Sequence, residues 1–146
     1  MQLDDLYQEV ILDHYRHPRC SGELAEDEAL VDEENPLCGD HLKLAAHISD
    51  GKLTGVKIQC QGCAICTASA SLMAEAVNDQ PLADIRKKSE AFLAVLRGER
   101  AASEDELGDL VALRGVAEFP LRVKCATLPW HALAAALQRL TAPPAA

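Results

Sequence analysis

Apolar residues at the start of the chain recur every three or four positions, which is the spacing of one face of an α-helix. This run extends over residues 4–16 and stops at His17-Pro18, where a proline ends the helical pattern. We therefore predict an amphipathic helix over residues 4–16. His14 and His17 are expected to be surface side chains of this helix and not metal ligands, because neither has a partner at a metal-site spacing.

After residue 41 the apolar period changes to two. Residues 42–48 alternate between apolar and more polar positions, which predicts a strand with one buried face. Asp50-Gly51 is a hairpin turn signal, and residues 53–58 are expected to return as the partner strand. A hairpin over 41–59 brings its two outer ends together, so the residues that flank it on either side are expected to be neighbours.

Helical patterns dominate the second half of the chain. Residues 64–78 carry an apolar stripe, and residues 82–97 are expected to hold one or two helices. Ser103-Glu104-Asp105-Glu106 has the pattern of a capping box that opens a short helix. A final helix is expected to follow Cys125, with Pro129 kinking or interrupting its start.

Length and charge narrow the classes of protein to consider. The 146 residues suit one domain over 1–146, with an ordered core over about 3–140. Fourteen basic against 23 acidic residues give a net charge of −9, which argues against nucleic acid or an anionic membrane as a partner. No apolar run approaches the length of a membrane span, and the N-terminus lacks the basic start of a signal peptide. We expect a cytoplasmic protein.

Carboxylates are concentrated between residues 23 and 34, where seven fall within twelve positions. The sequence predicts a solvated linker or an edge strand around Ala29–Val31 for this segment. The alternative is a docking surface for a basic partner.

Six cysteines point to metal or sulfur chemistry more than to disulfides, because the chain shows no export signal. One of them lies in the segment 35–40, where Pro36 stiffens the entry to a loop and Gly39 allows a tight bend. Cys38 and Asp40 are then expected to turn toward the same point, as half of a metal site.

Two cysteine sets compete for the chemistry. Spacing assembles a tetrahedral set of three thiolates and one carboxylate, which suits zinc or a small iron–sulfur cluster. Its members are Cys38, Asp40, Cys63 and Cys125. The other set is Cys60, Cys63 and Cys66, whose two-residue gaps are similar to a ferredoxin run. A helix that starts near Ala64 would direct Cys66 away from Cys60, which favours the first set.

Three motifs carry a resemblance to a known family. They are Asn35-Pro-Leu-Cys-Gly-Asp40, Gly62-Cys-Ala-Ile-Cys-Thr-Ala-Ser-Ala-Ser71, and Phe119-Pro-Leu-Arg-Val-Lys-Cys-Ala126 with Trp130. In this order they resemble the U-type iron–sulfur cluster assembly proteins, the IscU/SufU family. Lys124 stands where an IscU protein would carry histidine, and residues 98–116 resemble an insertion of SufU proteins, so the chain looks like the SufU branch.

The resemblance implies an α+β fold of the SufE/IscU-like kind, in which helices pack on a small antiparallel sheet. It implies zinc held by Cys38, Asp40, Cys63 and Cys125. It also implies that Cys38 accepts persulfide sulfur from a SufS-type cysteine desulfurase, once partner binding exchanges a zinc ligand, and that the sulfur passes to a downstream iron–sulfur scaffold. Whether the chain is itself an enzyme, or only the sulfur-accepting partner of one, stays open.

Two other functions use the same residues. The chain could be a scaffold that assembles a [2Fe–2S] cluster on the four ligands, or a zinc-stabilised interaction domain without a reactive thiol. Lys124 argues against the scaffold, because an ammonium group is not a metal ligand. An open Cys38-Gly-Asp40 loop argues against the interaction domain, because structural zinc sites favour closed shells.

Several side chains around the ligands have less defined roles. Arg122 and Lys124 are expected to offset the net charge of −2 that three thiolates and a carboxylate leave on Zn²⁺. Cys66 stands where the family usually has serine, and Cys60 is outside the family pattern. Each is expected to be a packing cysteine, with a second sulfur-relay thiol as the alternative. Cys20 is expected to be an incidental thiol.

Overall fold

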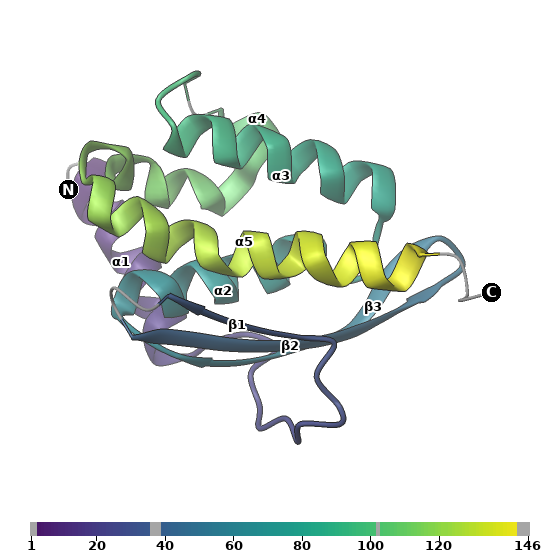
Figure 1. Ribbon diagram of the computed structural model, residues 1–146. Helices are drawn as coiled ribbons and strands as arrows, with labels where there is room; N and C mark the ends of the chain where they lie inside the picture. The colour runs from purple at the N-terminus through teal and green to yellow at the C-terminus, as the bar shows by residue number, and fades with distance from the viewer. Residues whose placement is uncertain (1–2, 36–38, 102, 143–146) are drawn as a thin grey trace.

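A computed structural model describes residues 3–35, 39–101 and 103–142, and their side chains from Tyr7 onward. Within these ranges the chain forms a four-stranded antiparallel sheet, and the helices gather on one face of that sheet (Figure 1). This arrangement confirms the α+β fold expected from the sequence. Among the described residues, none of the helices is long and apolar enough to cross a membrane.

The predicted hairpin is the centre of the sheet. Its strands pair with Leu42 opposite Cys60, which places the two ends of the hairpin side by side as expected. Asp50 and Gly51 both have positive φ, at 54° and 75°, as a two-residue turn of this kind requires. In their order across the sheet, the strands are β1 (Val31–Asn35), β2 (Asp40–Ser49), β3 (Lys52–Gln61) and β4 (Gln80–Pro81).

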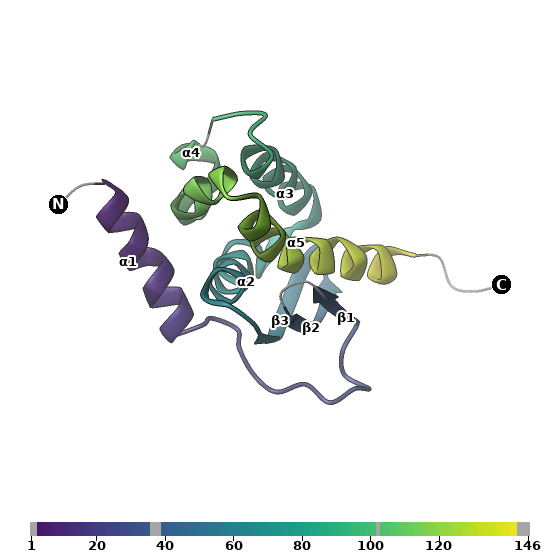
Figure 2. The same cartoon turned by 60° about the vertical axis from the view of Figure 1, so that its left-hand side comes forward.

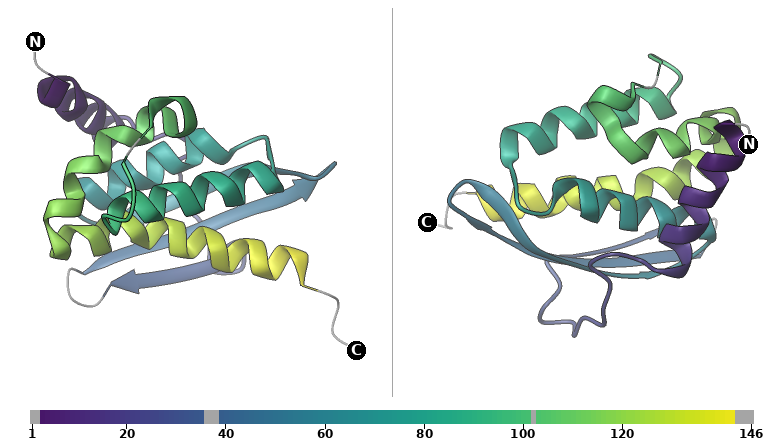
Figure 3. Two further views of the ribbon diagram at one scale, coloured as in Figure 1. Left: turned by 90° about the horizontal axis from the view of Figure 1, so that it is seen from above. Right: turned by 180° about the vertical axis from the view of Figure 1, so that it is seen from behind.

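Three helices form where the sequence predicts them, within one or two residues at their ends. They are α1 (Leu3–Arg16), α2 (Ala64–Val77) and α3 (Leu82–Leu96). The apolar stripe of α2 packs against α1, β3 and the final helix, α5 (Pro120–Thr141) (Figure 3). Ala68, Ala70 and Ala74 of α2 are almost fully buried, and their small side chains allow the neighbouring elements to approach closely.

The last third of the chain differs from the prediction. A short helix, α4 (Glu104–Leu107), follows Ser103, but Ser103 makes no side-chain cap hydrogen bond to the described residues, so the predicted capping box is wrong. A 3₁₀-helix, η1 (Gly108–Glu118), continues from it.

The final helix, α5 (Pro120–Thr141), begins five residues before Cys125 and does not follow it. Pro120 occupies the first turn, where its missing N–H removes no helical hydrogen bond. Pro129 lies inside the helix and does not interrupt it. Cys125 is therefore a helical residue, and its position is set by α5.

The core lies between the sheet and the helical layer. Leu42, Leu44 and Leu53 are fully buried on the helix-facing side of the sheet. Above them the rings of Phe92 and Trp130 pack with centroids 4.9 Å apart and tilted by 38°. α5 lies along β1 and β2 and closes this layer (Figure 1).

The connection between α1 and β1 passes along the opposite side of the sheet from the helices (Figure 2). It first pairs with the open edge of β3, where Ile58 N–H donates to Cys20 O at 2.8 Å and Gly22 N–H donates to Ile58 O at 3.1 Å. Leu24 anchors it as a buried side chain, while Glu23 and the acidic residues 26–28 are exposed. The acidic segment is thus a solvated linker that leads into the edge strand β1, as predicted.

His14 is buried, so the prediction that it is a surface side chain is wrong. Its side chain is only 2% exposed, and its Nδ1 lies 2.7 Å from Ser71 Oγ on α2. The Arg19 backbone N–H donates to the same Ser71 oxygen at 2.9 Å. Burial lowers the pKa of His14, because the charged imidazolium would lose its hydration. His17, by contrast, has an exposed side chain as predicted.

Candidate metal centre

Asp40 is the first residue of β2 and lies directly opposite Asn35 of β1. It is 1% exposed, and its Oδ1 accepts a hydrogen bond from the Cys63 backbone N–H at 2.9 Å. Its Oδ2 is also buried and has no hydrogen-bond partner among the described residues. A buried carboxylate oxygen without a partner is unfavourable by about 1–3 kcal/mol or more, so this atom indicates a missing ligand.

Gly62 makes room for that carboxylate. A Cβ atom built on Gly62 would lie 2.5 Å from Asp40 Oδ1 and 3.0 Å from Asp40 Cγ. Contacts as short as the first are essentially never seen, so a larger residue would displace the Asp40 side chain. Glycine is needed at this position because the carboxylate approaches the backbone closely.

Cys63 is the N-cap residue of α2. Its φ of −69° and ψ of 169° are extended, and its Sγ accepts a hydrogen bond from the Cys66 backbone N–H at 3.4 Å. The sulfur therefore lies at the positive end of the α2 helix dipole.

Cys125 approaches the same point from the second turn of α5. Its side chain is fully buried, and its Sγ makes a weak contact of 3.8 Å with Leu121 O. The ligand atoms of Asp40, Cys63 and Cys125 all lie within 4.8 Å of one another. Donor atoms in a tetrahedral zinc site are about 3.5–4 Å apart, so these residues fit a zinc ion after a small contraction.

Three of the four ligands expected from the sequence thus come together from β2, α2 and α5. The fourth, Cys38, lies outside the described residues. Its neighbour Gly39 has a φ of 73° and donates its N–H to Asn35 O at 2.8 Å, which closes the β1–β2 connection. Positive φ at Gly39 agrees with the tight bend expected there.

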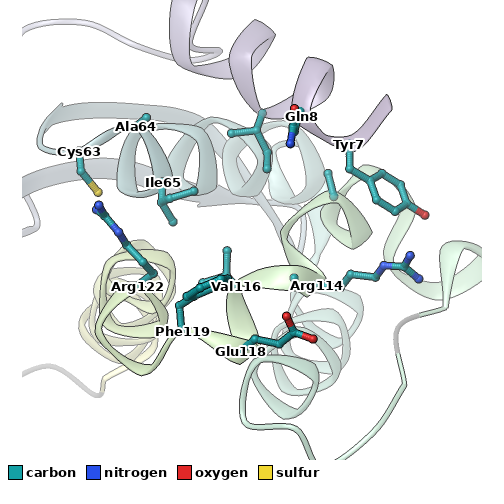
Figure 4. Close-up of a pocket in the computed structure, with 13 residues that line it drawn as sticks. Tyr7, Gln8, Cys63, Ala64, Ile65, Arg114, Val116, Glu118, Phe119 and Arg122 are labelled. Carbon is teal, nitrogen blue, oxygen red and sulfur yellow. The ribbon is translucent and has the colours of Figure 1, made fainter. Parts of the chain in front are cut away.

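Arg122 and Lys124 differ in their relation to the ligands. Arg122 lines a cavity of about 720 Å³ together with Cys63, and its guanidinium group is directed toward the Cys63 sulfur (Figure 4). Lys124 is exposed and is not among the residues that line this cavity. The cationic neighbour of Cys63 in this part of the structure is therefore Arg122.

The cavity extends from Cys63 to the N-terminal helix, between α1, the start of α2, η1 and the start of α5 (Figure 4). At its far end the Arg114 guanidinium lies over the Tyr7 ring, 5.0 Å from the ring centroid. The Tyr7 hydroxyl donates to Glu104 Oε1 at 3.1 Å. Phe119 lines the cavity with a side chain that is 59% exposed. The Cys63 end of the centre is therefore bordered by a partly apolar surface.

The direction expected for Cys66 is wrong. The Sγ atoms of Cys60 and Cys66 are 3.6 Å apart, and Thr67 Oγ1 lies 3.9 Å from the Cys60 sulfur. Cys66 lies in the first turn of α2 on the side that packs against β3, which brings it back over Cys60. The contact between the two thiols lowers the pKa of the Cys60 thiol, and the same contact together with burial raises the pKa of the Cys66 thiol.

The ferredoxin-like set is not assembled as one site. Cys63 turns toward Asp40 and Cys125, whereas Cys60 and Cys66 contact each other and do not belong to that cluster in the described part of the chain. In the sequence, the only indication of a contact between Cys60 and Cys66 is their short spacing. It could not reveal the contact by itself, because the packing of α2 on β3 decides where Cys66 points.

A second group of potential ligands surrounds His14. One ring nitrogen of His14 and carboxylate oxygens of Glu75 and Asp109 lie within 4.8 Å of one another. Both acidic residues are exposed, and Arg19 Nε lies 3.5 Å from Glu75 Oε2. This group brings together side chains of α1, α2 and η1, and Arg19 places a positive charge beside Glu75.

Comparison with known proteins gives a consistent result. The family model described as "NifU-like N terminal domain" matches residues 6–126. The chain is 40% identical over 131 residues to the zinc-dependent sulfurtransferase SufU of Bacillus subtilis (strain 168), with 90% of this chain and 88% of that protein covered. It is 36% identical over 138 residues to the iron–sulfur cluster assembly scaffold protein IscU of Streptococcus pyogenes serotype M1, with 94% and 86% covered.

A solved structure shares the fold. The crystal structure of a nitrogen-fixing NifU-like protein (N-terminal) from Brucella abortus superposes with a TM-score of 0.82 and 25% sequence identity. The match covers 94% of this chain and 96% of that chain.

Proposed function

The chain belongs to the family of the NifU-like N-terminal domain, the IscU/SufU proteins of iron–sulfur cluster assembly, and from this membership we propose that it is a zinc-dependent sulfur carrier. In this role Cys38 accepts persulfide sulfur from a SufS-type cysteine desulfurase and passes it to a downstream iron–sulfur scaffold in the cytoplasm. Residues 1–146 would act as one domain.

The observation that supports this proposal is the convergence of Asp40, Cys63 and Cys125, with one buried carboxylate oxygen that has no partner among the described residues. These residues, together with Cys38, would hold zinc. When bound, zinc would keep its cysteine ligands deprotonated at neutral pH, which is the form of cysteine that reacts with persulfides.

The sulfur-transfer step belongs to Cys38. Its thiolate would attack the terminal sulfur of the desulfurase persulfide, a new S–S bond would form on Cys38, and the desulfurase cysteine would leave as a thiolate. The Cys63 N–H holds Asp40 in place during this exchange, and Arg122 supplies positive charge beside the Cys63 sulfur. The hydrogen bond between Cys63 and Asp40 would keep the carboxylate oriented while Cys38 reacts.

The second candidate function is assembly of a [2Fe–2S] cluster on the same residues, which the 36% identity to an IscU scaffold protein favours. The two functions differ in the occupant of the site. A zinc carrier is colourless, whereas a cluster gives visible sulfide-to-iron charge-transfer absorption.

The test combines metal content with sulfur transfer. Protein purified without oxygen is analysed for zinc, iron and absorption, and is then incubated with a SufS-type desulfurase and cysteine. We expect one zinc per chain, faster desulfurase turnover, and an added sulfur on the Cys38 peptide by mass spectrometry. Cys38→Ser should abolish the added sulfur, and Cys20→Ser serves as the control. Stoichiometric iron and sulfide would instead support the scaffold.

A further inference from the structure

Cys60 and Cys66 form a pair of thiols that does not belong to the candidate metal centre. The two sulfurs come from different elements, the end of β3 and the first turn of α2, and lie 3.6 Å apart. A disulfide requires about 2.05 Å, so the sulfurs need to approach by about 1.5 Å. Rotation of the two side chains and a small shift of the first helical turn can provide this movement.

The two thiols are not equally accessible. Cys66 is fully buried, whereas Cys60 is partly exposed and lines a hollow of about 30 Å³ beside Pro18, Arg19 and Ser21. That volume holds one small group of about the size of a water molecule. A reagent from solvent therefore meets Cys60 first, and Cys66 is placed behind it as a resolving thiol.

We propose that Cys60 and Cys66 form a redox-active dithiol that releases sulfide from a persulfide formed on Cys60. This activity extends the proposed sulfur-carrier function, but it needs only a persulfide donor and not the desulfurase.

The reaction balances within the pair. The Cys60 thiolate attacks the terminal sulfur of a donor persulfide, R–S–SH, and the donor leaves as a thiolate, RS⁻. The Cys66 sulfur then attacks Cys60 Sγ, the Cys60–Cys66 bond forms, and the bond from Cys60 to its outer sulfur breaks. Hydrosulfide leaves and takes up the Cys66 proton. The transferred sulfur gains two electrons, and the two cysteine sulfurs lose one each.

Geometry favours attack on the inner sulfur of such a persulfide. Cys66 Sγ is in contact with Cys60 Sγ itself, while the hollow beside Arg19 and Thr67 offers space for the outer sulfur. Cys63, which lies between the two cysteines in sequence, is directed to the metal centre and takes no part. Sulfide can therefore be released without the loss of a metal ligand.

The test uses the full-length, zinc-loaded protein with glutathione persulfide under anaerobic conditions, without desulfurase. Released sulfide is measured against a protein-free blank, and cysteine linkages are mapped by mass spectrometry. We expect one equivalent of sulfide per chain and a Cys60–Cys66 cross-linked peptide that lacks two hydrogens. Cys66→Ser should lose this equivalent and retain the added sulfur on Cys60. Cys20→Ser should behave as the unchanged protein, since Cys20 is half-buried and has no described thiol beside it.

Hydrogen peroxide provides an independent test of the dithiol, because it oxidises the Cys60 thiolate to a sulfenic acid. Attack by Cys66 should then form the same disulfide with water as the leaving group, without any sulfur donor. Cys60→Ala should lose both reactions, and zinc content and circular dichroism verify that each variant is folded. Equal sulfide from Cys66→Ser would overturn the proposal. So would a Cys60–Cys66 disulfide that forms with peroxide but not with persulfide. If either result is found while Cys38 still accepts sulfur from the desulfurase, the proposed carrier function stands and only the dithiol proposal fails.

Discussion

The backbone N–H of Cys63 donates a hydrogen bond of 2.9 Å to Asp40 Oδ1, and so joins the start of α2 to the first residue of β2. This bond is made by protein atoms alone, so it orients the carboxylate before any metal binds. It occupies one oxygen and leaves the other, Oδ2, buried and available. Outer hydrogen bonds of this kind tune the affinity of metal sites.

Gly62→Ala tests the close approach of the carboxylate to the backbone. The added Cβ would lie 2.5 Å from Asp40 Oδ1, so Asp40 must move and we expect zinc affinity to fall by about 10–100-fold. Competition with a chromogenic chelator measures this change. Gly115→Ala is the matched control, because a Cβ there meets nothing within 4 Å and Gly115 has no positive φ. Equal affinity of the two variants would contradict the steric role of Gly62.

Asp40→Ala separates metal retention from sulfur acceptance. The cysteine ligands remain, so we expect part of the zinc to stay bound while desulfurase stimulation falls. Asp40→Asn keeps an oxygen that can accept the Cys63 N–H bond and should retain more zinc than Asp40→Ala. Zinc content and desulfurase turnover are measured on the same samples. Full stimulation by Asp40→Ala at normal zinc content would show that the carboxylate has no part in function.

Removal of zinc should destabilise the fold, because its ligands connect β2, α2 and α5. A ligand at 100 times its Kd stabilises the native state by about 2.7 kcal/mol, which corresponds to roughly 5–10 °C in a chain of this size. Melting curves before and after chelation measure the difference, and readdition of zinc should restore the higher midpoint. An unchanged curve after verified removal would rule out a structural contribution.

His14 predicts a pH dependence of stability. Its folded-state pKa is lowered from the ordinary 6.5 by burial, so the unfolded chain binds a proton at a higher pH than the native one. The stability that depends on neutral His14 is complete above about pH 6.5 and decreases as the pH falls below it. Arg19 acts in the same direction, while Glu75, Asp13 and Asp109 oppose it.

Urea unfolding at pH 7.5, 6.5 and 5.5 tests this prediction. His14→Gln should remove part of the pH dependence, and His17→Gln, at an exposed position just after α1, serves as the control. Ser71→Ala should destabilise the protein by about 1–3 kcal/mol at pH 7.5, because it leaves a buried imidazole nitrogen without its partner. Identical pH profiles for the unchanged protein and His14→Gln would contradict the burial argument.

Short-range sequence patterns were enough to predict much of the secondary structure. The change of apolar period at residue 41 and the Asp50-Gly51 turn predicted the hairpin and its approximate register. That register in turn brings Asp40 beside Cys63. The helices over 3–16, 64–77 and 82–96 were also predictable, since periodicity and proline positions act over a few residues. The motifs around Cys63 and Cys125 predicted two members of the candidate metal centre, and the structure brings their sulfur atoms together with the Asp40 carboxylate.

Side-chain direction was decided only by tertiary packing. Cys66 contacts Cys60 because α2 packs its first turn against β3, and His14 is buried because α1 packs against Ser71 of α2. The steric role of Gly62 depends on the Asp40 carboxylate, which is 22 positions earlier in the chain. The sequence alone determined where most helices and the central hairpin form, because apolar periodicity, turn residues and prolines act over a few neighbouring residues. Which side chains meet was determined by the orientation of whole elements, which depends on contacts between residues distant in sequence.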